Sequence, residues 1–119
     1  DSVRIKNGVG SLDATGLGNL NFRELEFEGG VGGANLDFTG SWQEDAEIRI
    51  QVGVGGVHVR MPRNVGVRVQ AEKHFLSGIH LEGFSKRDTY YCSENFDKAK
   101  VRVTMRVQTG VGGFRITWL

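Results

Sequence analysis

Hydrophobic and polar residues alternate along much of the chain. The pattern is clearest in residues 48–51, 57–61 and 114–118. Alternation with a period of two is typical of a β-strand with one face buried and the other in water. Further strands of this kind are predicted at residues 25–28, 36–38, 65–70 and 105–108. We therefore predict an all-β chain.

The alternation also predicts the orientation of individual side chains, because a shift of one residue would turn every side chain to the other face. The residues expected to face the core are Ile48, Ile50, Val57, Val59, Val67, Val69, Val101, Val103 and Ile116. Those expected to face solvent are Arg49, Arg60, Arg68, Arg102 and Arg115.

A Gly-Val-Gly motif recurs between the predicted strands. Its copies start at Gly8, Gly30, Gly53 and Gly110, at intervals of 22, 23 and 57 residues. Residues 77–81 form a weaker copy inside the long interval, and residues 16–18 form a further Gly-x-Gly. Glycine inside a helix costs about 1 kcal/mol relative to alanine, so these glycines are expected in turns. The predicted turn glycines are Gly8, Gly10, Gly30, Gly32, Gly53, Gly55, Gly110 and Gly112.

Strand, glycine turn and strand at a constant period favour a small parallel β-solenoid of about five coils, each of about 22 residues. An antiparallel sandwich is the alternative. Sandwich hairpins favour Asn-Gly or Asp-Gly turns, and Asn7-Gly8 is the one such pair in the chain. Residues 93–100, inside the long interval, could form a short helical turn capped by Ser93.

Stacked coils would also bring equivalent residues into columns. Each of four charged residues lies four positions before the first glycine of a Gly-Val-Gly motif, so we expect them in one outward column. These residues are Arg4, Glu26, Arg49 and Arg106. In such a column Glu26 would lie between two arginines at the strand spacing of about 4.8 Å.

The chain of 119 residues fits one domain, spanning residues 1–119, with one core. Its single cysteine, Cys92, excludes an internal disulfide and a cysteine-based zinc site. No run approaches the ~18 apolar residues of a membrane span, and no leader begins at Asp1. Any anchoring or targeting segment is therefore expected outside these residues, in a longer membrane-associated or exported protein.

The net charge of +1 hides an asymmetry between the two parts of the chain. Residues 1–47 carry nine acids and three bases, and residues 48–119 carry twelve bases and five acids. If coils stack in chain order, the acidic end of one molecule could bind the basic end of the next, or the basic part could dock on anionic lipid. Ordinary solvated faces are the alternative. The candidate interaction surface comprises Arg49, Arg60, Arg68, Arg102, Arg106 and Arg115.

The order and spacing of several motifs resemble the toast-rack domains of bacterial LiaF-like and adhesin-like envelope proteins. The motifs lie at residues 8–13, 30–32, 36–40, 53–57, 61–62, 65–69, 91, 95–99 and 110–112. The resemblance covers nearly the whole chain. It implies a right-handed, single-stranded β-solenoid in a bacterial envelope protein linked to envelope-stress signalling. It implies no catalytic residue, because the family has none established.

Candidate catalytic and metal-binding residues have simpler interpretations. Glu24, Glu26 and Glu28 would spread over about 13 Å along one strand, too far to converge on a calcium ion as in polysaccharide lyases. His58 and His80 occupy equivalent repeat positions and could stack one coil apart. They would need a third ligand to hold a metal. Cys92 has no adjacent arginine or histidine to activate it as a nucleophile.

Nucleotide and nucleic-acid binding are excluded by the pattern. Each Gly-Val-Gly leads into a strand, whereas a phosphate loop requires the N-terminus of a helix. The charge is nearly balanced, and no aromatic residues interleave with the basic ones. No cofactor is expected.

We predict a non-enzymatic scaffold or interaction domain, with a protein partner or self-association through the coil ends. A surface adhesin or carbohydrate-binding module using Trp42 and Trp118 is the alternative, although Trp118 is expected to point inward.

Overall fold

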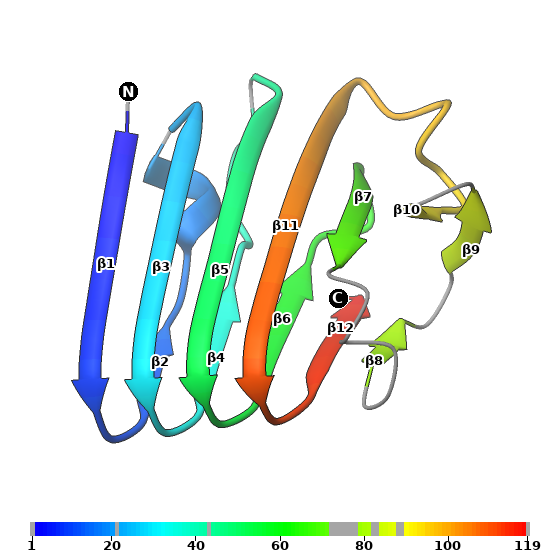
Figure 1. Cartoon of the computed structure of the whole chain (residues 1–119). Helices are drawn as coiled ribbons and strands as arrows, with labels where there is room; N and C mark the ends of the chain where they lie inside the picture. The colour runs from blue at the N-terminus through cyan, green and yellow to red at the C-terminus, as the bar shows by residue number, and fades with distance from the viewer. Residues whose placement is uncertain are drawn as a thin grey trace.

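The computed structural model describes residues 2–20, 22–42, 44–71, 79–81, 84–87 and 90–118. Two β-sheets face each other (Figure 1). In spatial order, the seven-stranded sheet contains β1 (Ser2–Val9), β3 (Glu24–Val31), β5 (Ala46–Val54), β11 (Val101–Val111), β7 (Val65–Ala71), β10 (Tyr90–Ser93) and β9 (Phe84–Arg87). The five-stranded sheet contains β2 (Leu12–Ala14), β4 (Ala34–Asp37), β6 (Val57–Met61), β12 (Phe114–Trp118) and β8 (Ile79–Leu81).

The repeated motif corresponds to a unit of two strands, one in each sheet. β1–β2, β3–β4, β5–β6 and β11–β12 are four such units, each with a Gly-Val-Gly at its bend (Figure 1). Neighbouring units pair in parallel: Arg4 is the partner of Glu26, Glu26 of Arg49, and Arg49 of Arg106. These pairs are separated by 22, 23 and 57 residues, the intervals between the motifs.

The first three units stack in chain order as expected, but the last one does not. The last unit, β11–β12, lies between β5–β6 and the strands β7 and β8. Beyond β7 the seven-stranded sheet becomes mixed, because β10 runs antiparallel to both β7 and β9. The all-β class is confirmed, but the wholly parallel pairing is not.

The core between the sheets follows the predicted alternation. Eight of the nine residues predicted to face inward are buried, and Val101 is half-buried. Four of the five predicted outward arginines are exposed, and Arg68 is half-buried. Both exceptions lie next to the segment after β10, where Phe96 packs beside Arg68. The register derived from alternation is therefore confirmed.

The short turn expected within residues 93–100 is present, but its capping differs from the expectation. Residues 94–98 form successive turns, with Phe96 N donating to Ser93 O at 3.1 Å and Ala99 N to Asn95 O at 2.9 Å. The Ser93 hydroxyl accepts a hydrogen bond from Val67 N in β7, so its predicted role as a helix cap is wrong. The described part of the chain contains a 3₁₀ helix that was not predicted, η1 (Leu17–Leu20), at the Gly-x-Gly of residues 16–18.

The glycine bends are shaped by backbone geometry and by stacking. Gly32 has a φ of 127° and Gly55 a φ of 136°, in the left-handed region that favours glycine. A Cβ on Gly55 would also collide with the carbonyl oxygen of Gly32 in the unit before it. The bends of adjacent units are therefore in direct contact through their backbones.

Candidate interaction surfaces

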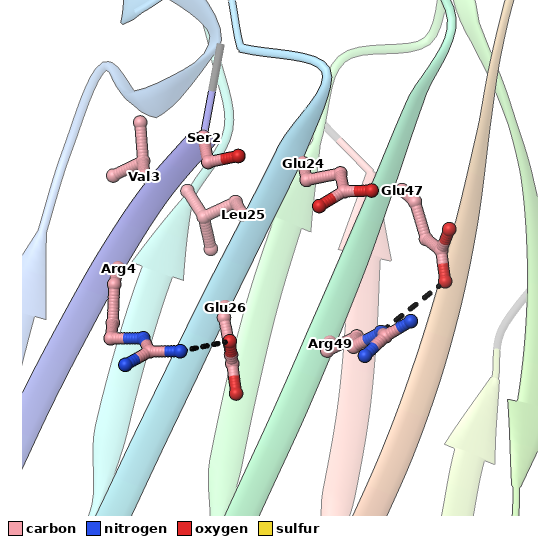
Figure 2. A pocket seen from close by; sticks show the side chains of 8 residues that line it. All are labelled: Ser2, Val3, Arg4, Glu24, Leu25, Glu26, Glu47 and Arg49. Carbon is pink, nitrogen blue, oxygen red and sulfur yellow. Dashed lines mark hydrogen bonds and ion pairs between the residues drawn. The ribbon is translucent and has the colours of Figure 1, made fainter.

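A column of charged side chains crosses the outer face of the seven-stranded sheet. Arg4, Glu26, Arg49 and Arg106 occupy one level on the adjacent strands β1, β3, β5 and β11, which confirms the predicted column. The Arg4 guanidinium lies 3.2 Å from the Glu26 carboxylate (Figure 2). These residues alternate with buried or half-buried ones, so their side chains project away from the core.

Within this column the ion pairs differ from the expectation. Arg49 turns to Glu47 on its own strand, with 3.4 Å between Arg49 Nε and Glu47 Oε1 (Figure 2). Arg106 Nε lies 3.4 Å from the same oxygen. Two arginines therefore share Glu47, while Glu26 pairs with Arg4. Exposed pairs of this kind contribute about 0–1 kcal/mol each, and they help to hold neighbouring units in register.

A shallow depression of about 270 Å³ lies beside this column, across β1, β3 and β5. Figure 2 shows its lining: Ser2, Val3, Arg4, Glu24, Leu25, Glu26, Glu47 and Arg49. Three carboxylates border it. Among the described residues, however, no three His, Cys, Asp or Glu side chains are grouped as metal ligands. The arginines give the depression both signs of charge, which suits a polar protein contact.

Two further predicted arginines hold the segment after β10 against the sheet. The Arg68 guanidinium carbon lies 4.9 Å from the centre of the Tyr90 ring and 5.7 Å from that of Phe96. Arg102 donates to the backbone carbonyls of Phe96 and Asp97, both at 2.9 Å. Cation–π contacts and paired hydrogen bonds of this kind fix side chains in place. Arg68 and Arg102 therefore have structural roles.

The remaining predicted arginines lie on the opposite face of the molecule. Arg60 in β6 and Arg115 in β12 project from the five-stranded sheet. Arg49, Arg68, Arg102 and Arg106 belong to the seven-stranded sheet. The six arginines therefore do not form one continuous surface, because strand alternation directs the outer residues of the two sheets in opposite directions.

The predicted histidine pair is separated by an arginine. In the backbone register Arg115 lies between His58 and His80, because β12 is inserted between β6 and β8. The expected stacking of the two histidines on adjacent coils is therefore wrong. Partial burial lowers the pKa of His58, and the charges of Arg60 and Arg115 lower it further. His58 Nε2 lies 3.0 Å from Thr117 Oγ1. A cation site is disfavoured here by the guanidinium charge.

The other candidate side chains are packed. The Cys92 thiol is buried. Trp42 donates from Nε1 to the Phe38 carbonyl at 2.8 Å, and Trp118 stacks on Phe84 with ring centres 5.6 Å apart. Both tryptophans pack against the core, so the inward orientation predicted for Trp118 is confirmed. The third histidine of the chain, His74, lies outside the described residues.

Sequence reasoning missed an apolar row at the bends. Val9, Val31 and Val54 are the central residues of three Gly-Val-Gly motifs, and they are 82%, 52% and 48% exposed. They are backbone partners on adjacent strands. The sequence did contain a signal for this row, because a valine between two turn glycines lies in a bend and therefore outside the core.

The end of the stack at β1 and β2 is also exposed. Both are edge strands of their sheets. Their inward residues Val3, Ile5, Leu12 and Ala14 contact the core but remain half-buried. The corresponding residues of the next unit are fully covered. Within the part of the chain that the structure describes, the first unit therefore presents two strand edges without a neighbouring strand, together with part of the apolar core.

The described residues contain no helix with the length and hydrophobicity needed to cross a membrane.

Known proteins show the same architecture. A family model, the N-terminal domain of toast_rack (DUF2154), matches residues 2–60. A crystal structure of a "putative cell adhesion protein" from Clostridium sporogenes superimposes with a TM-score of 0.86 and 28% sequence identity over 99% of this chain. The match covers 55% of the Clostridium protein, so this chain spans just over half of that protein's length. No curated protein matches it by sequence. The chain belongs to the toast-rack domain family.

Proposed function

We propose that the chain is a non-enzymatic interaction domain of a bacterial cell-envelope protein, built as a small β-solenoid. Its membership of the toast-rack family and its similarity to a protein named for cell adhesion support this proposal. The parallel stacking of units at intervals of 22 and 23 residues supports the solenoid description.

The observation that carries the proposal is the outer face of the seven-stranded sheet. Charged residues lie in register on four adjacent parallel strands, where hydrogen-bonded backbones hold them at a spacing of about 4.8 Å. A rigid array containing both signs of charge favours a partner with the complementary pattern and opposes others. Such an array requires neither a deep pocket nor a cofactor.

The environments of the candidate reactive residues also favour binding over catalysis. A nucleophilic thiol has to reach its substrate, and Cys92 is buried. His58 has Arg115 as its neighbour on the adjacent strand, which opposes the binding of a catalytic cation.

Capture of partners from native membranes tests this function. The immobilised chain is compared with the double variant Arg49→Gln/Arg106→Gln and with the control Arg60→Gln/Arg115→Gln on the opposite face. We expect the first variant to lose proteins that the unmodified chain and the control both retain. Equal capture by all three would contradict a role for the charged column.

A surface adhesin or carbohydrate-binding module is the second candidate, and the description of the Clostridium protein as a cell adhesion protein favours the adhesive role. Sugar binding normally uses an exposed aromatic platform, and Trp42 and Trp118 are packed against the core. A glycan array decides between the two. Binding to a defined glycan that Trp42→Ala abolishes would favour the carbohydrate role, and no glycan binding would favour protein contact.

The finer parts of the proposal concern location and pathway. We place the parent protein in the envelope, anchored to the membrane or exported, and in envelope-stress signalling. Cell fractionation should find it with membranes or outside the cell. Deletion of the domain should change the transcriptional response to a cell-wall antibiotic, and an unchanged response would remove the signalling role while leaving the binding role.

A further inference from the structure

We infer that the β1/β2 edge, formed by β1, the bend at residues 8–11 and β2, docks a strand–turn–strand segment of a partner polypeptide. This inference rests on the proposed binding function and assigns it a surface and a class of partner. The docked segment would continue both sheets by one parallel unit.

Gly8 is the first reason. At the equivalent position of the next unit, a Cβ on Gly30 would collide with the carbonyl oxygen of Gly8. In the third unit, a Cβ on Gly53 would lie 2.7 Å from the carbonyl oxygen of Gly30. Glycine is required at both positions because another bend is stacked against them.

Among the described residues, Gly8 has no such neighbour. A Cβ there would meet nothing within 4 Å, and Gly8 is absent from the glycines with positive φ. Neither backbone conformation nor space within the described residues requires glycine at this position. A further unit stacked on the first would place its own carbonyl there, as Gly8 does for Gly30. Contact with a docked unit would therefore explain why residue 8 is glycine.

The backbone of the bend is the second reason. Gly10 N donates to Val31 O at 2.9 Å, and Gly32 N donates to Val54 O at 2.9 Å. Each bend thus gives its amide to a carbonyl of the following unit. The equivalent carbonyl of the first unit is that of Val9, on the edge strand β1. A docked bend would donate its amide to Val9 O, in the manner of strand addition at a sheet edge.

The uncovered core is the third reason. Val3 and Ile5 are half-buried, whereas their partners on β3, Leu25 and Phe27, are each 1% exposed. A docked strand with apolar residues at alternate positions would cover Val3 and Ile5 and remove their apolar surface from water.

Charge selects the occupant. Arg4 and Lys6 project from β1 and face Glu26 and Glu28 on β3. Acidic residues on the docked strand would place each of these cations between two carboxylates, and like charges directly opposite each other are destabilising. The expected partner segment therefore carries acids at alternate positions, then a small residue in its bend.

A second copy of this chain fits less well. Pairing β1 with β1 of another copy would oppose the cations Arg4 and Lys6 to themselves. The other end strand of the seven-stranded sheet, β9, pairs antiparallel with β10, so head-to-tail pairing of two copies would not continue the series of parallel units. The strands β1 and β3 of the acidic part do lie at one end of the seven-stranded sheet, but the edge strand β1 itself carries the cations Arg4 and Lys6, which oppose docking of a basic end. We therefore assign an acidic polypeptide segment that lies outside residues 1–119.

The test uses a labelled synthetic peptide with the sequence of residues 22–38, which contains the pattern Glu-x-Glu-x-Glu and a glycine bend. Fluorescence anisotropy with the full chain should show saturable binding. A peptide with lysine replacing all three glutamates should bind at least about ten-fold more weakly. Hydrogen exchange should show added protection in β1 and β2 and none in β9.

Gly8→Val is the decisive variant. It should keep the thermal midpoint of the unmodified chain, because its side chain enters open space, yet weaken peptide binding about ten-fold or more by filling the docking position. The matched variant Gly30→Val should lower the thermal midpoint, because the same side chain meets the Gly8 carbonyl. This contrast separates a docking role from a folding role.

Three results would overturn the inference. The first is that the folded chain does not bind the peptide. The second is that Gly8→Val binds the peptide as tightly as the unmodified chain does. The third is that the chain self-associates and that Gly8→Val abolishes this, which would make a second copy the occupant. The proposed function fails separately. If Gly8→Val captured the same membrane partners as the unmodified chain, the proposed function would stand, but the β1/β2 edge would not be the surface that carries it.

Discussion

Arg49 and Arg106 are 57 residues apart in sequence, yet they are backbone partners on adjacent parallel strands and their Nε atoms each lie 3.4 Å from Glu47 Oε1. One carboxylate therefore joins the third unit of the chain to the last. Without it, two guanidinium groups would face each other across neighbouring strands, and like charges in that position are unfavourable.

Glu47→Gln tests this junction. We expect the free energy of unfolding to fall by about 1 kcal/mol in low salt and by less in 1 M salt, because screening weakens both the lost attraction and the remaining repulsion. Urea denaturation at two salt concentrations measures the difference. Glu44→Gln, which removes a carboxylate paired with Arg23, is the control and should have a smaller effect. Equal losses of unfolding free energy in the two variants would show that a carboxylate shared by two arginines stabilises the chain no more than a single ion pair does.

Gly55→Ala tests the stacked bends. The new methyl group would force an L-residue into a φ of 136° and meet the Gly32 carbonyl oxygen. We expect a loss of about 2–3 kcal/mol or more, measured by thermal and urea unfolding. Gly33→Ala is the matched control, since its Cβ would have its nearest neighbour, Gly56 O, at 3.7 Å and its φ is not among the positive ones. A control as unstable as Gly55→Ala would contradict the stacking argument.

Ser93→Ala tests how the segment after β10 is attached to the sheet. The buried Ser93 hydroxyl accepts from Val67 N at 2.9 Å and donates to Asn95 Oδ1 at 2.7 Å. Its removal leaves a buried amide without a partner, which should cost about 1–3 kcal/mol. Hydrogen exchange should also show faster exchange at Val67. Ser85→Ala, at an exposed position in β9, should change stability little. An unchanged exchange rate at Val67 would count against this role.

The pH dependence of stability should include a contribution from His58. Its pKa in the folded chain lies below the ordinary value of 6.5, because burial and two nearby arginines oppose the charged form. The folded state therefore binds fewer protons than the unfolded state. The contribution of His58 to the free energy of unfolding is fully present above pH 6.5 and is lost as the pH falls through the lowered pKa.

His58→Gln should remove this contribution. The thermal midpoint of the variant, measured between about pH 5 and pH 8, should vary less with pH than that of the unmodified chain. Both proteins titrate the same carboxylates, so the difference between their curves isolates the histidine. Parallel curves across this interval would show that His58 has the same pKa folded and unfolded.

The sequence by itself determined most of the strands, the faces of their residues and the pairing within the charged column. Alternation assigned Ile48 and Ile50 to the core and Arg49 to solvent, and the spacing of the motifs placed Arg4 beside Glu26. These are local or periodic properties. A side chain's face depends on the period of two, and the offset between neighbouring units depends on the length of chain between one bend and the next.

Only the tertiary structure decided the order of the units. β11–β12 carries the same alternation and the same Gly-Val-Gly as the earlier units, so periodicity alone could not place it between β6 and β8. That insertion put Arg115 between His58 and His80 and gave Glu47 to both Arg49 and Arg106. The physical reason is that equivalent units offer equivalent edges, and the choice among them depends on contacts between segments far apart in the chain, such as Phe96 against Arg68.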